Sequence, residues 1–162
     1  MADTMEGGSA ENGDQPQINV LGQYIKDLSF ENPNAPRSLR NAGKPGVEIS
    51  FNVQAQPIGE EIYEVLLSIE ATAKSDEDTV YTMELVYGGG FRLHKLPQEA
   101  IQPVLFIECP ALMFPFVRRL VADLTREGGY PPLLIDPIDF ASLYRQRMMQ
   151  AQAGNSMQAG NA

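Results

Sequence analysis

Residues 47–55 read VEISFNVQA, and apolar and polar side chains alternate along the whole stretch. The apolar positions are Val47, Ile49, Phe51 and Val53, and each is followed by a polar or charged residue. Successive side chains of a β-strand point to opposite faces, so this period of two predicts a strand with one apolar and one polar face. The stretch therefore indicates a sheet with one solvated side.

Three further segments show the same alternation, at residues 18–31, 61–73 and 79–91. A polar turn, KSDED at 74–78, joins the last two of them. Half-polar strands that follow one another, with a short turn between two of them, are typical of an antiparallel sheet. The sequence therefore predicts four antiparallel strands, with a loop rich in Pro, Asn and Gly at 32–46, long enough to be functional or mobile.

The period changes after the fourth strand, and the pattern becomes helical. A short helix, interrupted at Pro103, is predicted at 97–109, and a longer amphipathic helix at 111–129. Proline lacks a backbone N–H, so the longer helix is expected to begin near Leu112 and to hold Pro115 in its first turn. A last helix is predicted at 136–152. Strands followed by helices give the α+β fold class.

The last helix has a recognisable start. Asp136 is expected to be its N-cap, followed by Pro137 at the first helical position. The apolar faces of four strands and two main helices exceed what a small monomer covers, so we expect part of this surface to form an oligomer interface and part a binding surface.

The two ends differ from the middle of the chain. Residues 1–16 and 151–162 contain almost no large apolar side chains, so both are predicted to be disordered and to flank one domain at 17–150. The N-terminus does not have the pattern of a signal peptide, and no uninterrupted apolar run approaches the roughly 18 residues of a membrane span. We expect a cytoplasmic protein without direct membrane insertion.

The charge balance is acidic, with 12 Lys and Arg against 21 Asp and Glu and a formal net charge of -9. This charge disfavours nucleic acids and anionic membranes and favours a cationic partner. One cysteine and one histidine are too few for a Cys/His zinc site. No metal and no cofactor are expected.

Cys109 is the only candidate nucleophile of note, because it lies near a predicted helix start, where a thiol pKa can be lowered. A nucleophile also needs a base, and nothing marks the single histidine, His94, as one. Free cysteine usually behaves as a small buried apolar residue. We therefore predict a structural cysteine and no enzyme. YGGGF at 87–91 lacks the spacing of a phosphate-binding loop and is interpreted as a bulge or turn.

Several motifs follow one another in a specific order. DLSFENPNAP at 27–36 is followed by VYGGGF at 86–91, FPFVR at 114–118 and PIDFASLY at 137–144. In this order, over roughly residues 18–148, the chain resembles the SecB family of protein-export chaperones. The resemblance implies a homotetramer, built as a dimer of dimers. It would bind unfolded precursor proteins without ATP, keep them competent for translocation and deliver them to the motor ATPase SecA.

The resemblance also implies a groove for unfolded clients, bounded by the last helix and the connection after the first strand. Its apolar residues are expected to be Val47, Ile49, Phe51, Phe140, Leu143 and Tyr144. The helix between the sheets of a tetramer would use Phe116, Leu120 and Leu124 both as chain core and as subunit interface.

A second implied surface is acidic and would bind the basic tail of SecA. The matching residues are Asp27 and Glu31 on the first strand and Glu84 on the fourth. Thr82 stands where family members carry a leucine.

Without the family resemblance, the residues permit two other classes of function. One is a small α+β enzyme that uses Cys109, and the other is an oligomeric adaptor that binds one folded partner. A chaperone differs from an adaptor because it binds many unrelated unfolded proteins and ignores their folded forms.

Overall fold

The computed structural model describes residues 15–40, 44–76 and 78–160. In this part of the chain, strands come first and the main helices second, which confirms the α+β class. The elements are β1 (Gln17–Glu31), α1 (Arg37–Arg40), β2 (Gly46–Gly59), β3 (Ile62–Ser75), β4 (Asp78–His94), α2 (Gln98–Pro103), the π-helical segment η1 (Val104–Glu108), α3 (Cys109–Glu127) and α4 (Phe140–Ala159).

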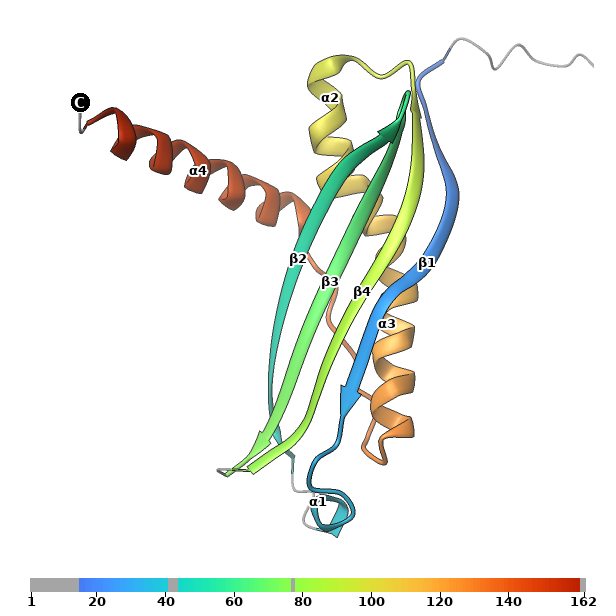
Figure 1. The fold of residues 1–162 in the computed structure, drawn as a ribbon, viewed down its shortest axis with the longest axis vertical. Coiled ribbons are helices and arrows are strands. Elements are labelled where there is room, and N and C mark those ends of the chain that lie inside the picture. The colour runs from blue at the N-terminus through green and yellow to red at the C-terminus, as the bar shows by residue number, and fades with distance from the viewer. Residues whose placement is uncertain (1–14, 41–43, 77, 161–162) are drawn as a thin grey trace, which may run out of the picture.

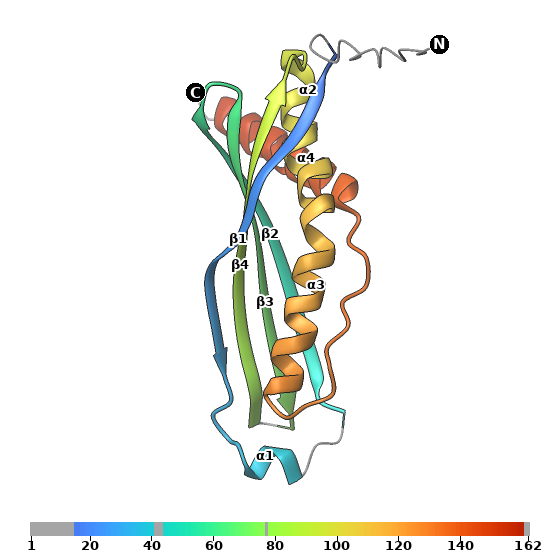
Figure 2. The same cartoon turned by 90° about the vertical axis from the view of Figure 1, so that its right-hand side faces the viewer.

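The four strands form one antiparallel sheet in the order β1-β4-β3-β2 (Figure 1). This confirms the predicted four-stranded antiparallel sheet. Each strand has 14 to 17 residues, about three times the usual strand length. The helices α2 and α3 run along one face of the sheet, and among the described elements no helix covers the other face (Figure 2).

The core lies between α3 and the sheet. Alternate residues of β3 and β4 are buried, as the period of two requires, and every third or fourth residue of α3 meets them. The fully buried side chains that form this layer are Val65, Leu67, Ile69, Met83, Leu85 and Phe91 of the sheet and Met113, Val117 and Val121 of α3.

The segments α2, η1 and α3 form one continuous helix of 30 residues, Gln98–Glu127. The predicted start near Leu112 is therefore wrong, because Pro103 and Pro115 both lie inside helical turns. Each proline removes one backbone donor, but burial of the apolar face against the sheet outweighs this local cost.

This helix is also long and apolar enough, by length and composition, to cross a membrane. Its apolar side chains instead contact the sheet, and those of Cys109, Val117 and Val121 have no exposed surface. The apolar character of the helix therefore serves the core of the fold.

Asp139 is the N-cap of α4, and its Oδ1 accepts a hydrogen bond of 3.0 Å from the backbone N–H of Ser142. The prediction that Asp136 caps this helix is wrong. The preceding residues are held in an extended conformation, because Arg118 donates to the carbonyl of Ile135 at 3.0 Å. Asp136 is therefore in an extended link, and the first carboxylate that can reach an unpaired N–H of α4 is that of Asp139.

The last helix continues to Ala159, beyond its predicted end at 152, so residues 153–159 are helical where only disorder was predicted. Alanine and glutamine make up more than half of residues 151–159, and both have high helix propensity. The described side chains of the segment are exposed, in agreement with the expectation that it does not pack. At the other end, residues 1–14 of the predicted N-terminal lead lie outside the described part of the chain.

The NPN motif that follows β1 is fixed by side-chain hydrogen bonds. The Asn32 amide donates to the carbonyl of Gly128 at 2.9 Å, and the Tyr130 hydroxyl donates to Asn32 Oδ1 at 2.6 Å. The Asn34 amide donates to the carbonyl of Thr79 at 2.8 Å. The start of the loop thus joins β1 to the end of α3 and to β4, which gives this motif a structural role.

A polar cluster on the open face of the sheet joins three of the four strands. Glu64 of β3 is 8% exposed and accepts hydrogen bonds from the Tyr24 hydroxyl, from Lys26 Nζ at 2.9 Å and from Gln56 Nε2 at 2.9 Å. The Tyr24 hydrogen bond, followed by the Lys26 hydrogen bond, lowers the pKa of Glu64. Burial, assisted by the hydrogen bond to Glu64, raises the pKa of Tyr24 to about 12.

The glycines of VYGGGF make room for this cluster. A Cβ at Gly88 would lie 2.4 Å from the ring of Tyr24, which crosses β4 at this position. The absence of a side chain is therefore needed here, and the run of glycines has a packing role within β4.

We expect Glu64→Gln to destabilise the chain by about 1–3 kcal/mol at pH 7, because the charged acceptor of three donors is lost. The folded-state pKa of Glu64 lies below its ordinary value of 4.5, so its contribution is complete above that value and is lost as the pH falls through the folded pKa. Urea unfolding at pH 7 and at about pH 3.5 measures this, and the difference between the two proteins should shrink at the lower pH. Glu60→Gln, on the exposed turn before β3, is the control. A difference that grows at low pH would contradict the prediction.

Candidate functional site

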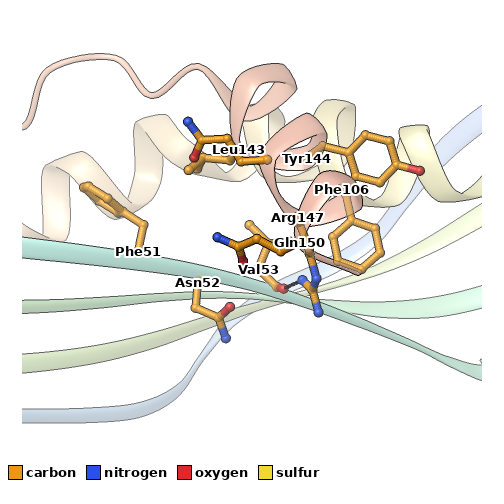
Figure 3. Close-up of a pocket in the computed structure, with 9 residues that line it drawn as sticks. Phe51, Asn52, Val53, Phe106, Leu143, Tyr144, Arg147 and Gln150 are labelled. Atoms are coloured by element: carbon orange, nitrogen blue, oxygen red, sulfur yellow. Dashed lines mark hydrogen bonds between the residues drawn. The ribbon is translucent and has the colours of Figure 1, made fainter. Parts of the chain in front are cut away.

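A cavity of about 350 Å³ lies between β2 and the first turns of α4 (Figure 3). Its walls come from β2, from η1 and from α4, so three segments far apart in the sequence meet here. The residues that dominate its lining are Phe51, Val53, Phe106, Leu143, Tyr144 and Arg147. We call this cavity, together with the free edge of β2, the β2–α4 groove.

Three of the predicted groove residues meet in this cavity: Phe51, Leu143 and Tyr144. Val47 and Ile49 lie on the same face of β2 as Phe51 and, like Phe51, are half-buried against the core, but they do not line the cavity. Phe140 does not line the cavity. It is 4% exposed and packs edge-on against Phe114, with 6.2 Å between the ring centroids. Phe140 therefore belongs to the core, because it is in the first turn of α4, where the helix contacts α3.

Two residues of the groove were missed as site residues. Phe106 of η1 stacks on Tyr144 with 5.9 Å between ring centroids, and the guanidinium of Arg147 lies 4.8 Å from the centre of the Phe106 ring. Arg147 is three residues after Tyr144, so helical spacing puts both on one side of α4. Phe106 could not be found in this way, because the sequence indicated a helix broken at Pro103.

The open face of the sheet carries the predicted acidic residues. The register gives three rows of four residues across β1, β4, β3 and β2, on the half of the face away from Glu64. The rows are Glu31-Thr82-Thr72-Glu48, Ser29-Glu84-Glu70-Ser50 and Asp27-Val86-Ser68-Asn52. All five carboxylates in these rows are exposed, and no row holds a lysine or arginine. Asp27, Glu31 and Glu84 thus share one face, which we call the acidic face.

Glu48 and Glu70 extend this face and were missed as site residues. Glu70 is directly opposite Glu84 on the neighbouring strand. Like charges at opposed positions destabilise a sheet, so this pair is kept at some cost to stability. The period of two placed both residues on polar strand faces, but only the register of the strands brings them beside Glu84. Thr82 is also on this face, with its hydroxyl 3.5 Å from the Glu31 carboxylate.

A second apolar surface lies along β1 and α3, opposite the β2 edge. Phe116 of α3 is 51% exposed, and Leu120 and Leu124 are half-buried. Beside them, a shallow cavity is lined by Ile25 of β1 and Tyr87 of β4 as well as by Phe116 and Leu120. The other large exposed apolar residues of β1 and α3 are Val20, Leu21, Tyr24, Leu28 and Leu112.

Cys109 is fully buried in the core, and burial raises the pKa of its thiol to about 12. The residue follows η1 without a break, so the helix offers no free N-terminus that would stabilise a thiolate. The prediction of a buried structural cysteine is confirmed.

Comparison with known proteins agrees with the geometry of the fold. Residues 11–151 match the family model described as "Preprotein translocase subunit SecB". The protein-export protein SecB of Azorhizobium caulinodans is 53% identical over 158 residues, which are 97% of this chain and 98% of that protein. SecB of Bartonella bacilliformis is 50% identical over 156 residues, which are 95% of this chain and 98% of that protein.

This chain belongs to the SecB family. The resemblance recognised in the sequence is therefore confirmed. Family membership supports a chaperone role in protein export, which points away from an enzyme.

A solved structure shares the SecB-like fold. It is the Mycobacterium tuberculosis SecB-like chaperone Rv1957 in complex with a ChAD peptide from the HigA1 antitoxin. The TM-score is 0.63 with 15% sequence identity, over 75% of this chain and 90% of that chain. At this identity, the likeness establishes the fold.

The opposed pair Glu70 and Glu84 predicts that Glu70→Gln stabilises this SecB chain. We expect a gain of about 0.2–1 kcal/mol in the free energy of unfolding at low salt, because a like-charge repulsion is removed. The gain should fall as the ionic strength rises, since both carboxylates are exposed. Urea unfolding at low and high NaCl measures this, again with Glu60→Gln as the control. A loss of stability at low salt would show that Glu70 makes a stabilising contact instead.

Proposed function

We propose that this chain is a cytoplasmic, ATP-independent chaperone that binds unfolded precursor proteins, keeps them competent for translocation and delivers them to the motor ATPase SecA. The observation that carries the proposal is the β2–α4 groove, where apolar side chains lie beside a strand edge that no other strand of the described residues covers. Unfolded chains expose apolar side chains and unpaired backbone groups, and folded proteins hide both. The groove offers partners to both kinds of group.

Binding in such a groove needs no nucleotide, because it uses only local contacts. Burial of apolar surface gives about 25 cal/mol per Å², so each contact with Phe51, Leu143 or Tyr144 is weak. Once one segment of a client is bound, the other segments of the same chain are held near the protein at a high effective concentration. Many weak contacts along one client therefore give a higher overall affinity. The peptide complex of the Mycobacterium tuberculosis SecB-like chaperone supports a role of this kind for the fold.

The proposed assembly is a homotetramer, built as a dimer of dimers. The apolar surface of β1 and α3 supports it, because Ile25 and Phe116 are large exposed apolar residues that line one shallow cavity, and exposed apolar groups of this kind mark protein interfaces. In this assembly Phe116, Leu120 and Leu124 contribute to the core of one chain and to the contact with the next. The β2–α4 groove is at the opposite edge of the sheet and stays open to clients.

The acidic face is the proposed site for the positively charged tail of SecA. Asp27, Glu31 and Glu84 are exposed on a rigid sheet, and Glu48 and Glu70 add charge of the same sign. A net charge of -9 per chain favours approach of a basic partner. No carboxylate of this face lines the groove cavity, and the two surfaces adjoin at Asn52, so one tetramer can hold a client and SecA together.

The double variant Phe51→Ala/Leu143→Ala should bind an unfolded client more weakly. We expect an affinity loss of about 10-fold or more, because each side chain contributes about 1.5–3 kcal/mol when it is buried. Fluorescence anisotropy with labelled, reduced and carboxamidomethylated α-lactalbumin measures the affinity. Met149→Ala, on an exposed position of the same helix, is the matched control. Native mass spectrometry should give four chains for all three proteins. Unchanged affinity in the double variant would overturn the assignment of the groove.

The triple variant Asp27→Asn/Glu31→Gln/Glu84→Gln should weaken SecA binding several-fold and leave client binding unchanged, because only the acidic face loses charge. Binding measured by calorimetry at two salt concentrations should show a smaller salt dependence for the variant. The matched control, Glu60→Gln/Glu99→Gln/Glu127→Gln, removes the same number of exposed carboxylates elsewhere. Equal loss in both triple variants would show that net charge, not the acidic face, binds SecA.

A further inference from the structure

Arg147 of α4 stands between two neighbouring cavities. The first is the cavity of about 350 Å³ in the β2–α4 groove. The second has about 280 Å³ and lies farther along β2, where its lining includes Gln54, Ala55 and Gln56 of β2 and Glu64 and Leu66 of β3. Arg147 and Phe106 line both. Figure 3 shows the Arg147 side chain reaching from α4 to the backbone of β2, with Phe106 beside it. One side chain and one ring therefore form the wall that separates the two spaces.

The contacts of Arg147 join all three walls of the groove. Its Nη1 donates a hydrogen bond of 2.6 Å to the carbonyl oxygen of Val53, and its guanidinium lies 4.8 Å from the centre of the Phe106 ring. Phe106 in turn stacks on Tyr144. A charged donor to a neutral carbonyl makes a short, strong hydrogen bond, so this contact holds α4 against β2.

The Val53 carbonyl belongs to the free edge of β2. In an antiparallel ladder, the backbone groups of successive residues point alternately toward the partner strand and away from it. Val53 binds α4 through its carbonyl, so the odd-numbered residues of β2 point away from β3. Pro57 is also an odd-numbered residue of β2, so its backbone nitrogen points away from β3. Proline, which has no N–H, is tolerated at such a free edge. Arg147 thus occupies the carbonyl oxygen of Val53, a hydrogen-bond acceptor that the backbone of an extended client beside β2 would otherwise reach.

We propose that Arg147 is a displaceable partition in the client groove. Bonded to Val53, it closes this part of the β2 edge and divides the groove. An extended client displaces it, and the two cavities then form one continuous channel along β2. The residue is exposed at the mouth of the groove, so its guanidinium can return to water when it leaves Val53. This inference rests on the proposed binding of unfolded chains in the groove.

The partition predicts an effect that depends on client length. A peptide of about six residues, about 20 Å when extended, fits beside one cavity, whereas one of about twelve residues must pass Arg147. If the open form is a minor state, the apparent affinity of the longer peptide is reduced by the fraction of open molecules. Removal of the Arg147 partition removes this reduction for the longer peptide. The affinity of the shorter peptide should not change.

The test compares Arg147→Met with Arg145→Met in the full-length protein. Both variants lose one positive charge from α4, but Arg145 contacts only Ser142 of its own helix among the hydrogen bonds and ion pairs of the described residues. Anisotropy with fluorescein-labelled six- and twelve-residue peptides rich in Leu and Phe gives the affinities. We expect Arg147→Met to bind the twelve-residue peptide about 3- to 10-fold more tightly than the wild type, with the six-residue peptide unchanged and Arg145→Met equal to the wild type.

A second variant and a second measurement guard against a folding defect. Arg147→Lys keeps the charge and a hydrogen-bond donor group but lacks the planar group over Phe106, so its affinity for the longer peptide should fall between those of the wild type and Arg147→Met. Hydrogen exchange without client should be faster in α4 of Arg147→Met than in the wild type. If the wild type binds the longer peptide and Arg147→Met binds it equally or more weakly, the partition is overturned. If the wild type binds neither the peptides nor unfolded α-lactalbumin, the proposed function fails, and this inference with it.

Discussion

The contact between one long helix and one face of a long sheet is the constraint on which the molecule depends. The sheet is four strands wide, and α3 of the continuous helix Gln98–Glu127 contacts mainly the two middle strands, β3 and β4. Three surfaces are left over as a direct result: the apolar flank of β1 and α3, the edge of β2, and the polar face that no described helix covers. Each of these surfaces carries one of the three proposed contacts, with another subunit, with a client and with SecA.

The open face of the sheet is itself divided into two regions that differ in their electrostatics. The open face of the sheet holds two kinds of carboxylate, and their surroundings differ. Glu64 is buried among donors, which lower its pKa and bind the strands together. The carboxylates of the acidic face are exposed and have carboxylates or hydroxyl groups as neighbours. The first arrangement stabilises the sheet, and the second leaves charge available to a partner at some cost to stability.

Local patterns predicted the strands well, because the period of two in residues such as Val47 to Val53 reflects burial of one face. The family resemblance, not a local pattern, predicted that Asp27, Glu31 and Glu84 share a face, and the usual behaviour of free cysteine predicted that Cys109 is buried. Local patterns failed where distant segments decide the outcome. Pro103 and Pro115 stay helical because the sheet holds their helix, and Phe140 is buried because Phe114 lies beside it. Arg147 has a role only because α4 lies across the edge of β2, which no local pattern reveals.

The attachment of α4 has a mechanical consequence. The helix is fixed at its first turn by the Asp139 cap and the burial of Phe140, and its 20 residues span about 30 Å. Farther along, the hydrogen bond from Arg147 to Val53 also holds the helix. Once that bond is displaced, as proposed, a rotation of about 10° around the first turn would move the far end by about 5 Å, while the core between α3 and the sheet keeps its packing. The helix can thus tilt as a rigid body about its buried first turn. Side chains of different thickness can be accommodated beneath it by a change of tilt, without any repacking of the sheet.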